Sequence, residues 1–176
     1  MELQILHAIQ GLHADWLNPV MIFLSAIGEV GLVWVAVSVI LAVIPRTRRC
    51  GLTMIAAMAL SFLLGNVFLK NLIARPRPCI VDTSVTMLVP VPAEYSFPSG
   101  HSLNGFTAAA VLFLYYKKPG IAALLLAAAI AFSRMYLFVH YPTDILAGML
   151  LGILDACVVY WLFQKKLWKE GAGKAK

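Results

Sequence analysis

Three short segments of this chain concentrate residue types that bind anions and transfer protons. Their defining residues are Lys70, Arg77 and Pro78 in the first segment, Pro98, Ser99, Gly100 and His101 in the second, and Ser133, Arg134, His140 and Asp144 in the third. Lysine and arginine supply fixed positive charge and directed N–H donors, which suit the several oxygens of a phosphate. The cations Lys70, Arg77 and Arg134 therefore predict a phosphate-binding site.

The second segment adds a place where backbone groups can meet the same anion. Ser99 and Gly100 directly precede an apolar run over 102–116 and stand where a helix should begin. Free N–H groups and the positive end of the helix dipole favour an anion there, and glycine permits close approach. We expect both residues to contact phosphoryl oxygens.

Two histidines supply what phosphoryl transfer still needs, a nucleophile and a proton donor. They are His101 and His140. Asp144 follows His140 by four residues and can accept a hydrogen bond from the imidazole, which fixes its tautomer. Pro142 fits the first turn of a helix and would leave His140 just outside it.

The composition indicates that a membrane positions these segments. Of 176 residues, 61% are hydrophobic and 12% are charged, whereas an ordinary soluble domain carries about 25% charged residues. A water-soluble domain of this size could not bury so much apolar side chain. Soluble enzymes, disordered chains and disulfide-stapled secreted folds are therefore excluded. The odd number of cysteines (Cys50, Cys79 and Cys157), without metal-type spacing, predicts free thiols.

The apolar segments predict an all-α, multi-pass transmembrane helix bundle of about five or six membrane helices. The predicted spans cover 51–69, 102–116, 120–139 and 145–163, and 19–44 is compatible with one long tilted span or with a short dipping helix followed by a second one. Residues 1–15 have helical spacing of apolar positions and predict an amphipathic helix on the membrane surface. We expect one domain over 1–176, with the bundle over 16–163 and a cytoplasmic basic tail over 164–176.

The basic residues predict an orientation. The net charge is +6, which by itself could suggest a nucleic acid partner. Ten cations fall on one face when five spans are threaded alternately, and the positive-inside bias makes that face cytoplasmic. They are Arg46, Arg48, Arg49, Lys117, Lys118, Lys165, Lys166, Lys169, Lys174 and Lys176. Lys70, Arg75, Arg77 and Arg134 collect at the opposite, extracytoplasmic face. We therefore expect a plasma-membrane protein with no nucleic acid partner, and with no signal peptide because no Lys or Arg precedes Arg46.

The three segments resemble the signature motifs of the type 2 phosphatidic acid phosphatase (PAP2) superfamily. Those motifs are K-x6-R-P, P-S-G-H and S-R-x5-H-x3-D, and every defining position is filled between residues 70 and 144. The predicted membrane helices before and after the motifs are also similar to those of the membrane branch of this family.

The resemblance implies a phosphatase that needs no metal or other cofactor. His140 would attack phosphorus and become a phosphohistidine, with Asp144 orienting its ring. His101 would protonate the leaving oxygen and then activate water. The remaining implied contacts hold the phosphoryl oxygens and come from Lys70, Arg77, Ser99, Gly100 and Arg134.

The substrate implied is a lipid phosphate, either polyprenyl or glycerolipid. The short single-domain form and the N-terminal surface helix are similar to bacterial undecaprenyl diphosphate phosphatases, which serve cell-wall synthesis. Gly100 departs from several of those enzymes, which carry Asp there. Phosphatidylglycerophosphate, phosphatidate or lipid A phosphatase activity therefore stays open, as does a lipid phosphotransferase. A non-catalytic protein that binds or moves anionic lipids is the alternative of another class, and the His140–Asp144 pair argues against it.

Three further ionisable residues have no motif position. Arg75 is expected at the interface or on a lipid headgroup rather than in catalysis. Glu29 lies in an apolar segment, where it could sit at a helix break near the site. Asp155 is expected to make a structural hydrogen bond or to be neutral inside the bundle.

Overall fold

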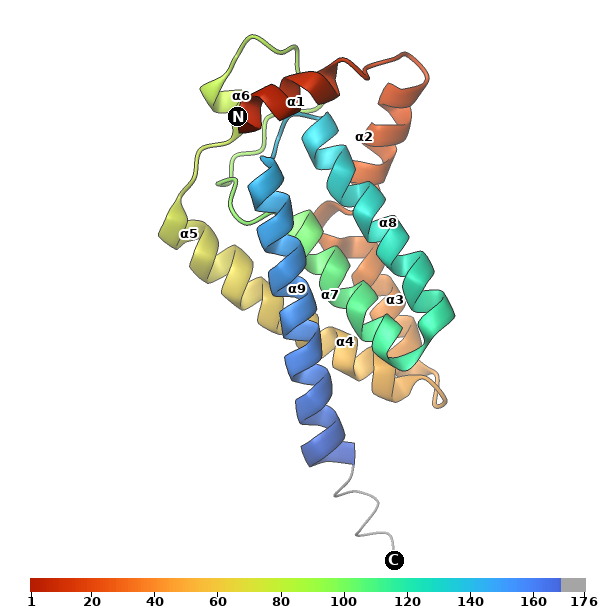
Figure 1. The fold of residues 1–176 in the computed structure, drawn as a ribbon. Helices are drawn as coiled ribbons and strands as arrows, with labels where there is room; N and C mark the ends of the chain where they lie inside the picture. Colours follow the sequence, from red (N-terminus) through yellow and green to blue (C-terminus); the bar gives the residue numbers. More distant parts are fainter. Residues whose placement is uncertain (169–176) are drawn as a thin grey trace, which may run out of the picture.

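The structure, a computed structural model, describes residues 1–168, which form helices joined by loops and contain no strand (Figure 1). The longer helices are α1 (Glu2–Gln10), α2 (Leu17–Ile27), α3 (Leu32–Val43), α4 (Arg48–Ser61), α7 (Gly100–Tyr115), α8 (Lys117–Tyr136) and α9 (Pro142–Leu162). The shorter ones are α5 (Lys70–Ile73) and α6 (Pro78–Val81), with the 3-10 turn η1 (Glu29–Gly31) and the π-helical segments η2 (Phe62–Leu69) and η3 (Phe163–Trp168).

Helix α7 is the centre of the bundle and packs against α8, α9 and α4. Its residues from Ser102 to Val111 are all buried. Small residues make the close packing possible: a Cβ at Gly148 would lie 2.7 Å from the Ser99 carbonyl oxygen, and one at Gly152 would lie 2.6 Å from that of Leu103. Small residues let membrane helices approach at backbone distance. This contact fixes the start of α7 against the start of α9.

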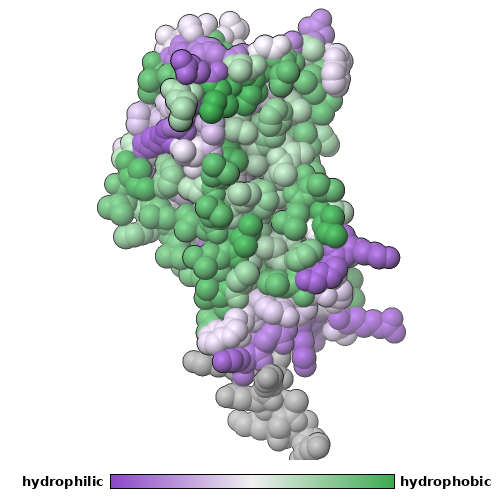
Figure 2. Space-filling view, in the orientation of Figure 1, coloured by the Kyte–Doolittle hydropathy of each residue, from purple (hydrophilic) through white to green (hydrophobic). Residues whose placement is uncertain are grey.

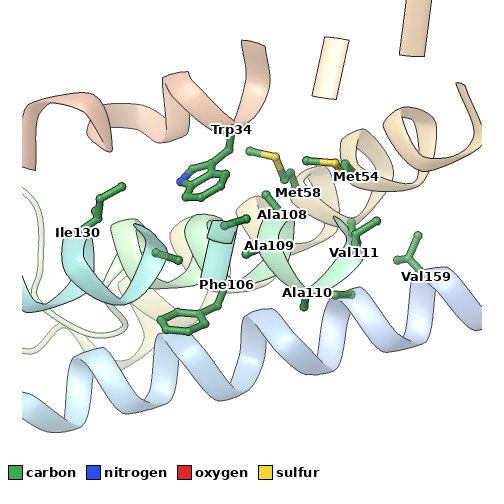
Figure 3. Packing of buried hydrophobic residues seen from close by; sticks show 14 of the residues in the cluster. Trp34, Met54, Met58, Phe106, Ala108, Ala109, Ala110, Val111, Ile130 and Val159 are labelled. Atoms are coloured by element: carbon green, nitrogen blue, oxygen red, sulfur yellow. The ribbon is translucent and has the colours of Figure 1, made fainter. Parts of the chain in front are cut away.

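The rest of the core lies between α7 and helices α3, α4 and α8 (Figure 3). Trp34 from α3, Met58 from α4 and Ile130 from α8 converge on the alanine-rich face of α7. A polar contact crosses the same region, because the Ser61 hydroxyl donates to the Asp155 carboxylate at 2.6 Å. Asp155 thus makes the structural hydrogen bond that was expected of it.

The segment 19–44 is broken rather than straight. Helices α2 and α3 meet at an angle of 45° across η1. Val30 and Gly31 there have φ values of 51° and 71°, a region that a β-branched residue occupies only at a cost. The segment therefore consists of two helices joined at a break where Glu29 is exposed, and the way it crosses the membrane stays a prediction.

Helix α4 continues through η2 into α5, and this run carries Lys70 to the end of the bundle. The chain then turns at Ala74, which has a φ of 46°. Arg77 is extended, and Pro78 starts α6 at a position where a missing N–H costs nothing. The first of the three motifs therefore bridges a helix end and a loop.

Apolar side chains surround the middle of the molecule. Figure 2 shows them as a green band, with hydrophilic residues gathered toward both ends. Three helices are long and apolar enough to cross a membrane (Arg48–Val81, Lys117–Tyr136 and Pro142–Lys165), and the bent pair α2–α3 brings the number to four if it counts as one span. Helix α7 has 16 residues and does not meet that length. The expected count of five or six membrane helices stays a prediction.

Helix α1 lies across one end of the bundle, beside the ends of α8 and α9 (Figure 1). His7 contacts Asp82 at 2.7 Å, and Gln10 donates to the Tyr136 carbonyl at 2.9 Å. Its location at a membrane surface stays a prediction. Most of the expected basic tail, including Lys169, Lys174 and Lys176, lies outside the described residues.

Candidate phosphate-binding and catalytic site

A cavity of about 660 Å³ lies at the α1 end of the bundle. It brings together six of the eight predicted site residues, from five different segments. They are Lys70, Arg77, Gly100, His101, Arg134 and His140. Asp144 lies directly behind His140, so the three motifs meet as the sequence predicted.

His140 has a tautomer defined by its three polar neighbours. Its Nε2 lies 3.1 Å from the Arg77 guanidinium, which can only donate, so Nε2 accepts. The proton is then on Nδ1, which lies 3.4 Å from the Ser96 hydroxyl and 3.5 Å from the Asp144 carboxylate. The lone pair of Nε2 therefore lies on the side of the ring where the cations are.

The pKa of His140 is lowered from its usual range to about 3. Burial is the largest cause, and the charges of Arg77 and Arg134 add to it, while the contact with Asp144 opposes them. Burial disfavours the charged form of an imidazole. His140 is therefore neutral at physiological pH, which is the state that a nucleophile requires.

Asp144 is fully buried and its carboxylate is saturated with donors. Oδ2 accepts from the Ser96 hydroxyl at 2.5 Å and from the Tyr141 backbone N–H at 2.9 Å. Oδ1 accepts from Arg75 at 2.7 Å. These bonds hold the carboxylate in one orientation beside the His140 ring.

His101 is on the first turn of α7 and is oriented by the broken helix pair. Its Nε2 lies 3.2 Å from the Ser25 carbonyl, which can only accept, so this nitrogen carries a proton. The Glu29 carboxylate lies 3.7 Å from the same nitrogen. Nδ1 is then the nitrogen of the neutral ring that can take up a proton. Glu29 therefore reaches the site, as its position in the sequence allowed.

The three cations are buried around the cavity. Arg77 donates to the Glu94 and Val139 carbonyls at 2.7 and 2.9 Å. Lys70 forms an ion pair with Glu94 at 2.5 Å, and this hydrogen bond holds the pKa of Glu94 below its usual range. Arg134 donates to the Ser25 hydroxyl, but its buried Nε–H has no partner among the described residues. Such an unpaired donor is costly unless an anion accepts from it.

Two residues at the start of α7 were expected to bind phosphate, and the structure places only one of them at the cavity. Gly100 lines the cavity. Ser99 is fully buried, and its hydroxyl accepts from the N–H and hydroxyl of Ser102 as the cap of α7. The hydroxyl of Ser99 thus stabilises the helix end, and its contact with phosphate stays a prediction.

Sequence reasoning missed several residues that hold the site together. Ser96 binds Asp144, Ser25 binds both Arg134 and His101, and Glu94 binds Lys70. None of them stands at a motif spacing, and each meets its partner only through the fold. Among residues 1–168 the structure contains no group of three or more His, Cys, Asp or Glu side chains that could hold a metal ion.

Comparisons with known proteins show the family to which the chain belongs. Residues 50–168 match the family model described as the PAP2 superfamily. The chain belongs to the PAP2 superfamily. An undecaprenyl-diphosphatase from Sulfolobus acidocaldarius is 38% identical over 137 residues, which are 77% of this chain and 66% of that relative.

Two solved structures have the same fold. Aquifex aeolicus LpxE has a TM-score of 0.80 and 27% identity, covering 90% of this chain and 94% of its own. A PAP2-type phosphatidylglycerolphosphate phosphatase from Bacillus subtilis has a TM-score of 0.74 and 30% identity, covering 93% and 84%. The chain is thus a membrane phosphatase of the PAP2 superfamily, with the all-helical fold that its sequence predicted.

Proposed function

We propose that this PAP2 protein hydrolyses a polyprenyl diphosphate, undecaprenyl diphosphate, through a phosphohistidine at His140 on the extracytoplasmic side of the membrane. The observation that carries the proposal is the geometry of His140. Its unprotonated Nε2 is beside Arg77, and its Nδ1–H faces Ser96 and Asp144, in a cavity lined by cations. A binding protein would not need a nucleophile held in this way.

The first chemical step forms a bond between His140 Nε2 and the terminal phosphorus. The P–O bond to the lipid phosphate breaks, and its electron pair goes to the leaving oxygen. This oxygen takes a proton from Nδ1 of His101, whose ring is protonated once the negative charge of the bound substrate offsets the neighbouring cations. Lys70, Arg77 and Arg134 neutralise the charge on the equatorial oxygens, which is the main catalytic contribution in phosphoryl transfer. Asp144 stabilises the positive charge that develops on the His140 ring.

The second step releases phosphate. His101 Nδ1 accepts a proton from water as the water oxygen attacks phosphorus, and the P–N bond to His140 breaks. The electron pair returns to Nε2, so both histidines regain their starting states. No metal ion takes part in either step.

The shape of the cavity supports a lipid substrate. Its cationic floor is bordered by apolar residues from the broken helix pair, from η2 and from the loop before Glu94, including Ile22, Val30, Phe62, Val89 and Val91. A second, apolar cavity of about 310 Å³ shares Val30, Phe62 and Asn104 with the first. A diphosphate headgroup can occupy the polar part while the hydrocarbon chain follows the apolar side chains into the bilayer.

Charge placement supports the extracytoplasmic side. Arg48 and Lys117 begin α4 and α8 at the end of the bundle opposite His140 (Figure 1). Basic residues favour the cytoplasmic side of a membrane. The cations near the site have local partners, which are carboxylates for Lys70 and Arg75. Arg77 donates to backbone carbonyls and Arg134 to the Ser25 hydroxyl, so the location of all four has a local reason.

The experiment is phosphate release by the purified protein in detergent and excess chelator. The panel contains undecaprenyl diphosphate, undecaprenyl phosphate, phosphatidylglycerophosphate and phosphatidate, each with wild type and with His140→Ala. We expect turnover of undecaprenyl diphosphate that persists in chelator and falls by about 10⁴-fold or more in His140→Ala. Activity that survives this substitution would contradict the mechanism, and activity abolished by chelator would indicate a metal enzyme.

Phosphatidylglycerophosphate is the second candidate substrate. It is favoured by the structural similarity to the Bacillus subtilis phosphatase, which extends over 93% of this chain. The same cationic cavity suits a glycerolipid monophosphate, from whose headgroup two acyl chains extend side by side instead of one prenyl chain. A higher kcat/KM for phosphatidylglycerophosphate in the panel would select it.

A further inference from the structure

Arg75 stands outside the three motifs, yet its side chain contacts both the third motif and the N-terminal helix. Its Nη1 lies 2.7 Å from both the Asp144 carboxylate and the Thr143 hydroxyl, and its Nη2 lies 2.6 Å from the Glu2 carboxylate. The guanidinium also lies 3.8 Å above the ring of Tyr141. Three segments distant in sequence therefore meet at one side chain.

These contacts divide the oxygens of Asp144 between two tasks. Oδ1 accepts from Arg75, while Oδ2 faces Ser96, the Tyr141 N–H and the His140 ring. A carboxylate that can rotate would present either oxygen to the imidazole at varying distance. Arg75 fixes Oδ1 and thereby leaves Oδ2 for His140, since a guanidinium binds a carboxylate with strong directional preference.

Glu2 completes the arrangement from the N-terminal helix. Its Oε2 accepts from Arg75, and its Oε1 accepts from the Thr143 hydroxyl at 2.7 Å and from the Thr143 backbone N–H at 3.2 Å. Thr143 is on the first turn of α9, directly before Asp144. Glu2 thus holds both the arginine and the helix turn that carries the catalytic carboxylate.

We propose that Arg75 is a positioning residue for the His140–Asp144 pair and that Glu2 of α1 holds Arg75 in place. The proposal rests on the function proposed above, because it assigns the two residues to catalysis by His140. Neither residue lines the cavity, so neither is expected to contact the substrate. Helix α1 then contributes to turnover through one ion pair, in addition to covering the end of the bundle.

The test separates positioning from binding and from folding. Arg75→Gln, Arg75→Lys and Glu2→Gln are compared with wild type and with Arg46→Gln, an exposed arginine at the opposite end of the bundle. Arg75→Gln should lower kcat about 10- to 100-fold with KM nearly unchanged, the range for a lost hydrogen bond to a charged group. Arg75→Lys should recover part of the loss, Glu2→Gln should lower kcat less, and Arg46→Gln should leave it unchanged.

A double-mutant cycle identifies the route of the effect. If Arg75 acts through Asp144, then Arg75→Gln costs little in the Asp144→Asn background, because contacting residues are not additive. Full additivity would overturn the proposal, as would wild-type kcat in Arg75→Gln or an effect confined to KM. Thermal unfolding of each variant is measured in parallel, and kcat losses that Arg75→Lys does not recover, together with a lowered midpoint, would assign Arg75 to folding instead.

The outcomes distinguish this proposal from the function on which it rests. The variants are assayed with whichever phosphate ester the wild type hydrolyses, so the choice of lipid does not decide the result. Failure of the proposed function appears as a wild-type activity independent of His140. If the positioning role is wrong, the activity depends on His140 but kcat is unchanged in the Arg75 variants.

Discussion

The environment of His140 combines two requirements that usually conflict. A nucleophilic imidazole must be neutral before the reaction, but its ring becomes positively charged as it binds phosphorus. Burial and the neighbouring Arg77 keep the free ring neutral, while Asp144 lies on the opposite nitrogen to accept the developing charge. When the substrate binds, its negative oxygens offset the charge of Arg77. The positively charged form of the His140 ring therefore becomes more favourable only when the reaction is about to occur.

The protonation state of His140 can be measured directly. We expect its ring resonances, assigned by comparison with His140→Asn, to show no titration between about pH 8 and about pH 5, because its pKa is near 3 rather than near 6.5. Arg77→Gln should raise this pKa by removing a repelling charge. A wild-type midpoint near 6.5, by NMR of ring-labelled protein in detergent, would contradict the prediction.

The same lowered pKa has a consequence for stability. The folded state takes up fewer protons at His140 than the unfolded state between the folded pKa of about 3 and the usual value of 6.5. The contribution of this side chain to the free energy of unfolding is therefore fully present above pH 6.5, and it decreases as the pH drops toward 3. His140→Asn should reduce the acid sensitivity of unfolding over this interval, as measured by denaturation in detergent.

Motif spacing predicted which charged groups gather in the cavity, but it could not predict what holds them. The sequence identified Lys70, His101 and His140 because each motif places residue types that bind anions or transfer protons within a short stretch of chain. Ser96 and Arg75 act on Asp144 from 48 and 69 residues away. Their spacing carries no signal, since a serine or an arginine near an interface is ordinary in any membrane protein.

At the scale of helices, the distance between α7 and α9 sets the geometry of the site. Helix α7 begins with Gly100 and His101, and α9 begins two residues after His140. The two helices touch at backbone distance at Gly148 and Gly152. Any change in this spacing therefore moves the two histidines relative to each other.

A single methyl group at this contact tests that dependence. Gly152→Ala places a Cβ 2.6 Å from the Leu103 carbonyl oxygen and 3.0 Å from the Thr107 backbone nitrogen, so one of the helices must shift. We expect a loss of about 1–3 kcal/mol in the free energy of unfolding, together with a lower kcat. Leu150→Ala on the outer face of the same helix, where Leu150 is 63% exposed, is the control and should retain activity. An unchanged unfolding midpoint in Gly152→Ala would contradict the close-packing interpretation.

The helices themselves follow from the apolar runs, but their interruptions do not. The sequence predicted long helices near α4, α8 and α9, with boundaries that differ by a few residues. It left the segment 19–44 undecided, because Gly28, Glu29 and Gly31 are compatible with a helix or with a break. Val30 and Gly31 have left-handed conformations, and Gly31 lies so close to α7 that a Cβ there would be 3.1 Å from the side-chain nitrogen of Asn104. Local propensity contains no information on such tertiary proximity.

At the scale of the whole molecule, polarity and charge are arranged along one axis. An apolar band surrounds the middle (Figure 2), the site and α1 lie at one end, and the N-termini of α4 and α8, with Arg48 and Lys117, lie at the other (Figure 1). The positive-inside bias predicts that the basic end of a membrane protein with this distribution lies in the cytoplasm. Under the proposed function, the substrate phosphate is presented on the opposite side.

Cysteine labelling in intact cells tests this orientation. In a variant with Cys50, Cys79 and Cys157 replaced by serine, a single cysteine is introduced at Leu12, which is 53% exposed at the site end, or at Lys118, which is exposed at the basic end. A maleimide that does not cross membranes should label Leu12→Cys in intact cells and Lys118→Cys only after the membrane is opened, because the positive-inside bias retains the basic loops in the cytoplasm. Retained phosphatase activity shows that each variant is folded. The reverse labelling pattern would place the cavity on the cytoplasmic side, and a substrate headgroup on the outer leaflet could then no longer reach His140.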